Sequence, residues 1–514
     1  MRVKVDHLTK HAEEIGDRIA VIDDKAGQPV REFNYVVFNE QVNALANGFL
    51  ALGASEGSHI AWWGNNSVEV LLTIHAIRKS GGVSIPIPYR STREEANYLL
   101  GVADVEILVI ENRYVSVIEG LREELPNLKH IITFGMDKEK SVEKTMGEIL
   151  GPVSTPSSEG NFASTHNMIF TSGTTGNPKG AVRKVGGEAN QYGPLLQLLG
   201  WDRMDSLIFL TTGPLYHSGP SGFALRSQLV GATVVTQYAF DPVDWLRLVS
   251  THNVSATFSA PTPIRRITSL PNDVKDMYDV SSLRSLIANA APWTMNLKRA
   301  YLRDFREDSL WEVYGSTELS VCTVLAPNDQ LRKPGSCGVP APGVEIQLID
   351  DKGNVINEPN TPGELYARSS ALFKTYYKSH DRYLEDHRDG YQTVGDIAYV
   401  DEEGYFFICD RKKDMIISGG VNVYPAEIEN VLDEYPLVEE VAVIGVPDDE
   451  WGEVVCALVV AESEFPTDDL LIFARSHLSG AKVPKHVFFI DDLPKTGSGK
   501  ILKRDLREYV KGEK

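Results

Sequence analysis

Residues 171–180, which read TSGTTGNPKG, combine the side chains and the backbone freedom that a polyphosphate site needs. Hydroxyl and lysine side chains can donate to phosphate oxygens, and glycines let backbone N–H groups approach a ligand closely. A solvent-exposed loop has a similar composition, so this stretch alone leaves both interpretations open. If it binds phosphate, the residues that we expect to take part are Thr171, Ser172, Gly173, Thr174, Thr175, Gly176 and Lys179.

The spacing within this stretch excludes the P-loop of common nucleotide-binding proteins. A P-loop requires G-x-x-x-x-G-K-[ST], whereas Lys179 follows Pro178 and precedes Gly180. The later GSGK sequence that ends at Lys500 also fails, because Pro494 stands where the first glycine is required. A phosphate-binding role would therefore place the chain in another class of nucleotide enzyme.

The composition limits the classes of protein that the chain can belong to. Its 514 residues exceed one ordinary hydrophobic core and predict two or more domains. A formal net charge of -20 argues against a nucleic-acid partner. No stretch approaches the roughly 18 continuous apolar residues of a membrane span, and the N-terminus does not resemble a signal peptide. The four cysteines show neither zinc-site nor disulfide spacing: Cys322, Cys337, Cys409 and Cys456.

We therefore expect a cytoplasmic protein that has no integral membrane segment. The sequence leaves a homodimer open. Apolar runs such as residues 60–63 and 107–110 alternate with helical patterns such as residues 68–77, which indicates α/β architecture with largely parallel strands. After Gly335 the apolar runs shorten, which predicts an antiparallel β subdomain, and a mixed segment follows residues 410–414.

Four further motifs lie downstream of the glycine-rich stretch. They are VYGSTE at 313–318, TVGDIA at 393–398, DRKKDMIISGGVNVYPAEIE at 410–429 and PKTGSGKILKRDLR at 494–507. In this order, the five motifs resemble those of the adenylate-forming superfamily of acyl-CoA synthetases, aryl-CoA ligases, adenylation domains and luciferases. The resemblance covers essentially the whole chain. It implies an N-terminal AMP-binding domain at 1–409, a hinge at 410–413 and a small mobile α+β domain at 414–514.

The resemblance also implies a two-step reaction that uses ATP, Mg²⁺ and coenzyme A. A carboxylate attacks the α-phosphate of ATP to give an acyl-adenylate and pyrophosphate, and a thiol then displaces AMP. Positioning and charge neutralisation dominate such transfers. By resemblance, Glu318 binds magnesium, Asp396 accepts the ribose hydroxyls and Arg411 supports the ribose. The remaining nucleotide contacts that it implies are Asn289, Ala290, Ala291, Tyr314, Gly315, Ser316 and Thr317.

Lys500 is the strongest catalytic candidate from the C-terminal region. An isolated lysine among glycines and serines is usually a solvated surface residue. By resemblance, however, Lys500 bridges the substrate carboxylate and the α-phosphate during adenylation, and Lys413 is the hinge residue about which the small domain rotates. After that rotation, Gly419 and Gly420 would line the pantetheine tunnel.

His217, in PLYHSGP, lies where amino-acid-activating relatives carry an aspartate, so an amino-acid substrate is not expected. By resemblance it gates the path of the carboxylate and the thiol; the alternative is a core histidine. We expect a medium- or long-chain fatty acid or another hydrophobic acid, and hence a role in fatty-acid metabolism. An aryl, cyclic or short hydroxy acid, or a carrier protein in place of coenzyme A, is the alternative. The expected pocket walls are Gly219, Gly222, Phe223, Ala260, Gly315, Leu319 and Val321.

Three arginines near this pocket are harder to assign. Arg226 interrupts an apolar helical run, and surface exposure is the favoured interpretation. The alternative is a polar anchor for a coenzyme A phosphate or for a polar acyl tail. The adjacent Arg265 and Arg266 are equally ambiguous.

Overall fold

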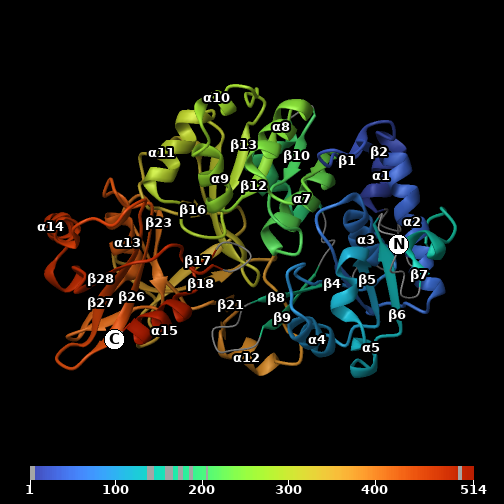
Figure 1. Ribbon diagram of the computed structural model, residues 1–514. Coiled ribbons are helices and arrows are strands. Elements are labelled where there is room, and N and C mark those ends of the chain that lie inside the picture. Colours follow the sequence, from blue (N-terminus) through green and yellow to red (C-terminus); the bar gives the residue numbers. More distant parts are fainter. Residues whose placement is uncertain are drawn as a thin grey trace.

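The computed structural model describes residues 6–135, 144–156, 166–171, 178–184, 189–203, 206–495 and 500–513. Within these ranges the strands form four sheets, and helices pack against them (Figure 1). The C-terminal strands β26 to β28 (within residues 440–489) lie on the opposite side of the molecule from β5, β6 and β7 (within residues 107–145). The described helices are α1 (His7–Glu14), α2 (Tyr35–Ala51), α3 (Val68–Lys79), α4 (Arg93–Val102), α5 (Leu121–Glu124), α6 (Ala189–Leu198), α7 (Ser218–Leu229), α8 (Pro242–His252), α9 (Pro261–Thr268), α10 (Asn272–Lys275), α11 (Met295–Asp304), α12 (His380–Glu385), α13 (Pro425–Asp433), α14 (Thr467–His477) and α15 (Lys503–Glu513).

One sheet, which we call the N-terminal sheet, contains the two strands that flank the glycine-rich stretch. Its inner strands pair in parallel, and their apolar runs are buried on both faces, as the sequence predicts. The strand before the stretch and the strand after it pair antiparallel, with Thr171 opposite Lys179. In spatial order the strands are β19 (Thr375–Tyr376), β9 (Lys179–Lys184), β8 (His166–Thr171), β4 (Val83–Pro86), β3 (His59–Trp63), β5 (Ile107–Glu111), β6 (His130–Phe134) and β7 (Lys144–Thr145).

The second sheet, the central sheet, is also mostly parallel. Only the strands at its two ends run antiparallel to their neighbours. In spatial order the strands are β16 (Val339–Pro340), β15 (Ser320–Leu325), β14 (Leu310–Ser316), β13 (Ser285–Ala288), β12 (Ala256–Ser259), β10 (Ile208–Thr211), β11 (Thr233–Thr236), β1 (Ile19–Asp23) and β2 (Arg31–Asn34).

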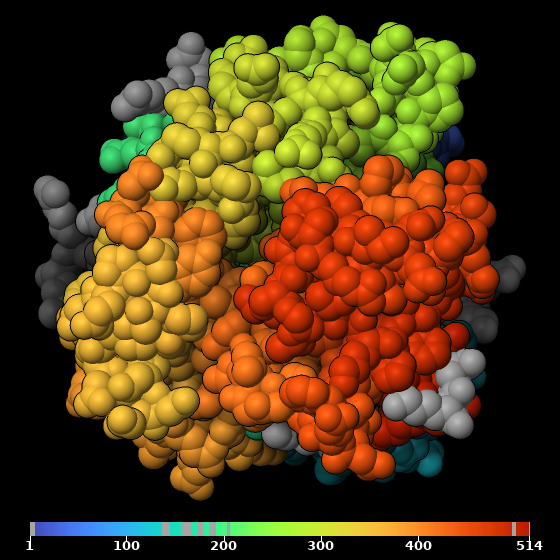
Figure 2. All heavy atoms as spheres, turned by 90° about the vertical axis from the view of Figure 1, so that its left-hand side faces the viewer, coloured from blue at the N-terminus to red at the C-terminus, as the bar shows by residue number. Residues whose placement is uncertain are grey.

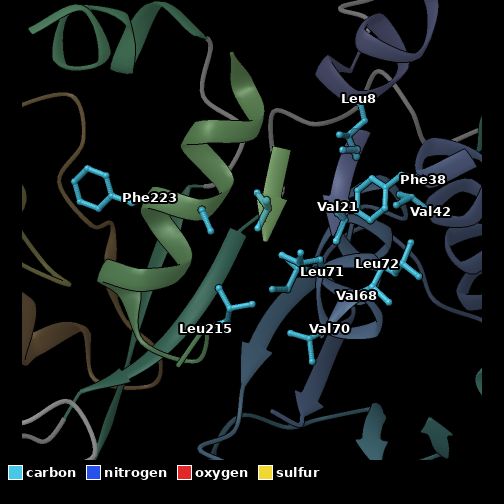
Figure 3. Close-up of a cluster of buried hydrophobic side chains, with 14 of the residues drawn as sticks. Leu8, Val21, Phe38, Val42, Val68, Val70, Leu71, Leu72, Leu215 and Phe223 are labelled. Carbon is cyan, nitrogen blue, oxygen red and sulfur yellow. The ribbon is translucent and has the colours of Figure 1, made fainter. Parts of the chain in front are cut away.

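A hydrophobic core joins the N-terminal and central sheets through helices α2, α3 and α7. Side-chain caps define where two of these helices begin: Asn34 accepts from the backbone of Val37 at the start of α2, and Ser67 accepts from Val70 at the start of α3. In Figure 3, Leu71 and Leu72 of α3 pack in the same cluster as Phe38 of α2. Phe223 projects from the other side of α7, away from these leucines.

The two remaining sheets follow in sequence. The β subdomain is antiparallel, as predicted, and comprises β17 (Glu345–Ile349), β18 (Gly363–Arg368), β20 (His387–Arg388), β21 (Tyr391–Gln392), β22 (Asp396–Val400) and β23 (Phe406–Arg411). The C-terminal sheet comprises β24 (Ile416–Ser418), β25 (Val421–Val423), β26 (Glu440–Asp448), β27 (Gly452–Val460) and β28 (His486–Phe489), and α13 to α15 surround it. The predicted α/β class with a β subdomain and a small C-terminal α+β region is confirmed.

The C-terminal region packs directly against the rest of the chain (Figure 2). The amide of Asn296, on α11, donates to the carbonyl of Asp433 over 2.5 Å. Arg265, on α9, donates to the carbonyl of Glu439 and lies 3.5 Å from the Glu440 carboxylate. In the described part of the chain, no helix combines the length and the apolarity that a membrane crossing requires. All four cysteines are buried.

Candidate active site

One cavity of about 1390 Å³ collects residues from the N-terminal sheet, the central sheet and the C-terminal region. Thr171 reaches it from the end of β8, and His217 reaches it from the start of α7. Lys500 reaches it from the segment before α15, with Asp492–Lys495 of the same segment. The predicted site residues that line this cavity are Thr171, His217, Asn289, Ala290, Gly315, Ser316, Thr317 and Lys500.

Thr317 and Glu318 lie at the tip of a tight turn between β14 and β15. Gly315 is required there, because a Cβ at this position would lie 1.9 Å from the carbonyl oxygen of Ser320. Ser320 itself has a φ of 65°, in the left-handed region. The hydroxyls of Thr317 and Ser218 are 2.9 Å apart, so this turn is tied to the start of α7.

Glu318 is buried behind the Thr317 end of the cavity. The hydroxyl of Tyr376, on β19, donates to its Oε1 over 3.0 Å. Among the described residues no group of three or more His, Cys, Asp or Glu could hold a metal ion by itself. A single carboxylate nevertheless fits magnesium that arrives on a nucleotide, because Mg²⁺ commonly takes one or two carboxylates together with phosphate oxygens and water.

Asp396 forms the second acidic position, at the start of β22. Its Oδ2 accepts from the Tyr314 hydroxyl over 2.6 Å, and its Oδ1 lies 3.6 Å from Nε of Arg411. Strand pairing places Asp396 directly opposite Arg411 on β23. Burial raises the pKa of the Asp396 carboxyl above its ordinary value, although Arg411 opposes this shift.

Lys500 completes the cluster. Burial lowers the pKa of its ammonium group, and the charge of Arg411 lowers it further, whereas Asp396 and Glu318 act in the opposite direction. These interactions place the lysine among the acidic residues of the other motifs. The structure thus brings Lys500 of the C-terminal motif to the cavity that Thr171 and Thr317 of the N-terminal motifs also line.

The turn after β13 presents backbone to the same cavity. The Asn289 amide donates to the carbonyl of Val313, and the N–H of Ala290 donates to Oδ1 of Asn289 over 2.5 Å. Ala290 has a φ of 78°, which is strained for a residue with a Cβ and is held here by these bonds. Ala291 follows in the turn but is not among the residues that line the cavity.

The predicted hinge and tunnel residues lie away from the cavity. Beside Lys413, Asp410 pairs with Lys503 over 3.1 Å, and Asp414 pairs with Arg507 over 2.9 Å. Gly419 and Gly420 form the turn between β24 and β25, with φ values of 57° and 81°. A Cβ on Gly419 would lie 2.6 Å from the Trp451 ring. Both glycines are exposed and do not line the cavity in this arrangement.

The acyl end of the cavity shows where the sequence-based assignments succeeded and failed. His217 precedes α7, and its ring centroid lies 4.3 Å from that of Tyr216. Arg226 does not point to solvent as favoured, but lines the cavity. Arg265 contacts the C-terminal region, as described above, whereas Arg266 lines the cavity. Six of the expected walls line it (Gly219, Gly222, Phe223, Ala260, Gly315 and Val321), and Leu319 is buried elsewhere.

Several contributors were not singled out from the sequence. Arg183, on β9, donates to the carbonyl of Thr317 and, over 3.0 Å, to that of Ala371. Tyr192, on α6, and Tyr376 were also missed. For Arg183, the available signal was an arginine within an apolar strand. Neither tyrosine belongs to a recognisable motif, so the sequence offered no signal for them. The predicted phosphate contacts Ser172, Gly173, Thr174, Thr175 and Gly176 lie outside the described residues.

Comparison with known families explains this arrangement. The family model for AMP-binding enzymes matches residues 8–377, and the model for the C-terminal domain of AMP-binding enzymes matches residues 427–500. The chain is an AMP-binding enzyme of the adenylate-forming superfamily. The expected membership is thus confirmed, together with the expected class of AMP-forming acid–thiol ligase.

Individual proteins resemble this AMP-binding enzyme along nearly its whole length. A feruloyl-CoA synthase from Amycolatopsis sp is 34% identical and covers 92% of this chain and 93% of its own. An indoleacetate–CoA ligase from Aromatoleum aromaticum is 31% identical and covers 94% of each chain. Among solved structures, ATP-bound MatB from Rhodopseudomonas palustris is 26% identical, with a TM-score of 0.86 and 98% of each chain covered.

Proposed function

We propose that this enzyme joins an aromatic carboxylic acid to coenzyme A at the expense of ATP, through an acyl-adenylate. The observation that carries the proposal is that Lys500 and Thr317 line one cavity whose acyl end has aromatic walls. The lysine supplies positive charge, and the turn of Thr317 and Glu318 supplies hydrogen-bond donors and a buried carboxylate. These groups suit a reaction in which pyrophosphate leaves first and a thiol then attacks the adenylate carbonyl.

Each residue of the cluster has a distinct role in the proposed adenylation step. Lys500 donates to the acid's carboxylate and to an α-phosphate oxygen, so that the carboxylate oxygen can attack phosphorus while pyrophosphate leaves. Thr317 donates to the same phosphate. Asp396 accepts the ribose hydroxyls, and Tyr314 fixes its orientation. Glu318 would hold magnesium, which supplies charge neutralisation on the phosphates when bound.

The acyl end favours a flat aromatic acid over a fatty acid. The rings of Phe223 and Phe258 stack with centroids 5.5 Å apart and planes 24° apart. Gly219 keeps this wall flat, since a Cβ there would lie 2.4 Å from the Phe258 ring. Offset stacking on such rings stabilises an aromatic ligand. The relatives named above for feruloyl and indoleacetate substrates support the same choice, so the aryl alternative replaces the expected fatty acid.

The test is acid-dependent exchange between ATP and pyrophosphate, followed by product analysis with coenzyme A. The panel contains cinnamate, indoleacetate, benzoate, octanoate and palmitate. We expect the aromatic acids to give the highest kcat/KM and to yield a thioester and AMP. Preference for octanoate or palmitate would restore the fatty-acid assignment. Acyl-AMP that accumulates without thioester would indicate a different acceptor, such as a carrier protein.

A further inference from the structure

The acyl end of the cavity contains an arginine that none of the proposed steps uses. Arg226 lies on α7 and lines the cavity together with Phe223 and Val321. Its side chain folds back by one helical turn over Gly222, where a Cβ would lie 2.7 Å from its Nη1. The absence of a side chain at position 222 therefore makes room for the guanidinium at this place.

An aromatic ring holds the guanidinium from the other side. The Arg226 guanidinium carbon lies 4.4 Å from the ring centroid of Tyr192 and 5.2 Å from that of Phe223. Both are cation–π distances. Burial by itself would raise the pKa of the Tyr192 phenol, but the charges of Arg226 and Arg183 bring it below its ordinary value. The two arginines thus give this wall of the cavity a positive potential.

The charge of the Glu318 carboxylate acts on Arg183 and offsets part of this potential, but no ion pair joins Arg226 to an Asp or Glu of the described residues. Arg183 donates to two backbone carbonyls, so its hydrogen bonds are committed to the fold. Nε of Arg226 is buried and finds no hydrogen-bond partner among the described residues. The guanidinium does donate to the Tyr192 phenol, so it is Nε that is left without an acceptor. A buried donor without an acceptor is costly, and a planar oxygen acceptor suits a guanidinium best.

The position along α7 gives the distance between the guanidinium and His217, the residue beside which the proposed function places the reacting carboxylate. Gly222, over which the guanidinium folds, lies five residues after His217. A rise of about 1.5 Å per residue puts it roughly 7 Å further along the helix axis. An extended aromatic acid bears its para substituent at a comparable distance from its carboxylate.

We propose that Arg226 selects aromatic acids that carry an oxygen acceptor at the end opposite the reacting carboxylate, and that a second carboxylate binds it best. This inference rests on the proposed function, because it assigns the acid's far end to the same cavity. Arg226 is a specificity-determining residue here and takes no part in the transfer of the adenylyl group.

The test compares three acids of one shape in the pyrophosphate-exchange assay: cinnamate, 4-hydroxycinnamate and 4-carboxycinnamate. The wild type should use them in rising order of kcat/KM. Arg226→Met should lower the ratio of 4-carboxycinnamate to cinnamate by on the order of tenfold or more, mainly through KM, and leave cinnamate nearly unchanged. Arg226→Lys should keep part of the ratio, because it retains the charge but loses the planar fork.

Two further variants separate specificity from general damage. Gly222→Ala should displace the guanidinium and lower the same ratio while Arg226 is still present. Arg299→Met removes an exposed arginine on α11 and should leave the ratio unchanged. Thermal melting of each variant reports on folding, and calorimetric binding of 4-carboxycinnamate gives a readout that needs no turnover.

An unchanged ratio in Arg226→Met would overturn the inference, and so would a wild type that prefers cinnamate. Normal exchange with a raised KM for coenzyme A would also overturn it, because it would assign Arg226 to a coenzyme A phosphate. If no aromatic acid supported exchange, the proposed function would fail as well. If aromatic acids were used without any effect of Arg226, only the inference would fail.

Discussion

The hydroxyl of Tyr314 donates to Oδ2 of Asp396 over 2.6 Å, although 82 positions separate the two residues in sequence. Tyr314 belongs to β14 of the central sheet, and Asp396 begins β22 of the β subdomain. Arg411 faces the same carboxylate from β23. The bond therefore joins two sheets at the proposed ribose site and fixes the direction in which the carboxylate can accept.

Replacing Asp396 by Asn should raise the KM for ATP by about ten- to a hundredfold, because hydrogen bonds to a charged acceptor are worth about 1.5–3 kcal/mol. Burial raises the pKa of this carboxyl, so in the wild type the KM for ATP should increase as the pH falls through a value above that of an ordinary aspartate. Asp396→Asn should lack this acid limb. The exposed Asp389→Asn is the control, and an acid limb that survives in Asp396→Asn would assign it elsewhere.

Replacing Lys500 by Ala should cost on the order of a hundredfold or more in pyrophosphate exchange, as loss of a donor to a developing charge does. Thioester formation from supplied acyl-AMP should be largely retained, because the adenylate is already made. Lys511→Ala removes an exposed lysine of α15 and serves as the control. Equal losses in both half-reactions would contradict a role confined to adenylation.

The same lysine should produce an alkaline limb in the pH profile of exchange. Burial lowers the pKa of its ammonium, so the charge is lost as the pH rises through a value below the ordinary lysine value of about 10.4. The kcat/KM for exchange, which reports on the free enzyme, should fall there. Lys500→Arg should move the limb beyond the accessible range, since guanidinium stays protonated. A limb at the same pH in that variant would show that another group titrates.

A methyl group at Gly315 should disrupt the turn that carries Thr317 and Glu318. The added Cβ would lie 1.9 Å from the Ser320 carbonyl oxygen. This oxygen belongs to the backbone, so it cannot move away without distorting the turn. Gly315→Ala should therefore lose most exchange activity. Gly147→Ala, where a Cβ would meet nothing within 4 Å, should behave as wild type. Activity and melting temperature measured together would reveal whether the loss is local, and an active Gly315→Ala enzyme would disprove the tight turn.

Replacing the proposed hinge residue Lys413 by Pro should impair the thioester step more than the exchange step. Proline fixes φ and removes an N–H, which stiffens a segment that we propose must rotate between the half-reactions. Single-turnover measurements of the two steps would separate the effects. Lys413→Ala, which removes the same charge without fixing the backbone, is the control. If thioester formation were insensitive to Lys413→Pro, residues 410–413 would not be the hinge.

Much of the architecture was predictable because it depends on local pattern. The apolar run before Thr171 is β8, residues 68–77 lie within α3, and the repeated short runs after Gly335 form the antiparallel β subdomain. The five motifs predicted Thr317 and Lys500 as site residues only together, through their resemblance to those of a known family.

The sequence by itself predicted the class of enzyme, because its five motifs resemble those of a known family, and it predicted the alternation of strands and helices, because apolar periodicity is a local pattern. Only the tertiary structure decided which walls face the acid. Arg226 looked like a surface residue because arginine usually is one, yet folding places Gly222 beneath it and Tyr192 over it. Such placement depends on contacts between segments far apart in sequence, which local sequence patterns do not predict.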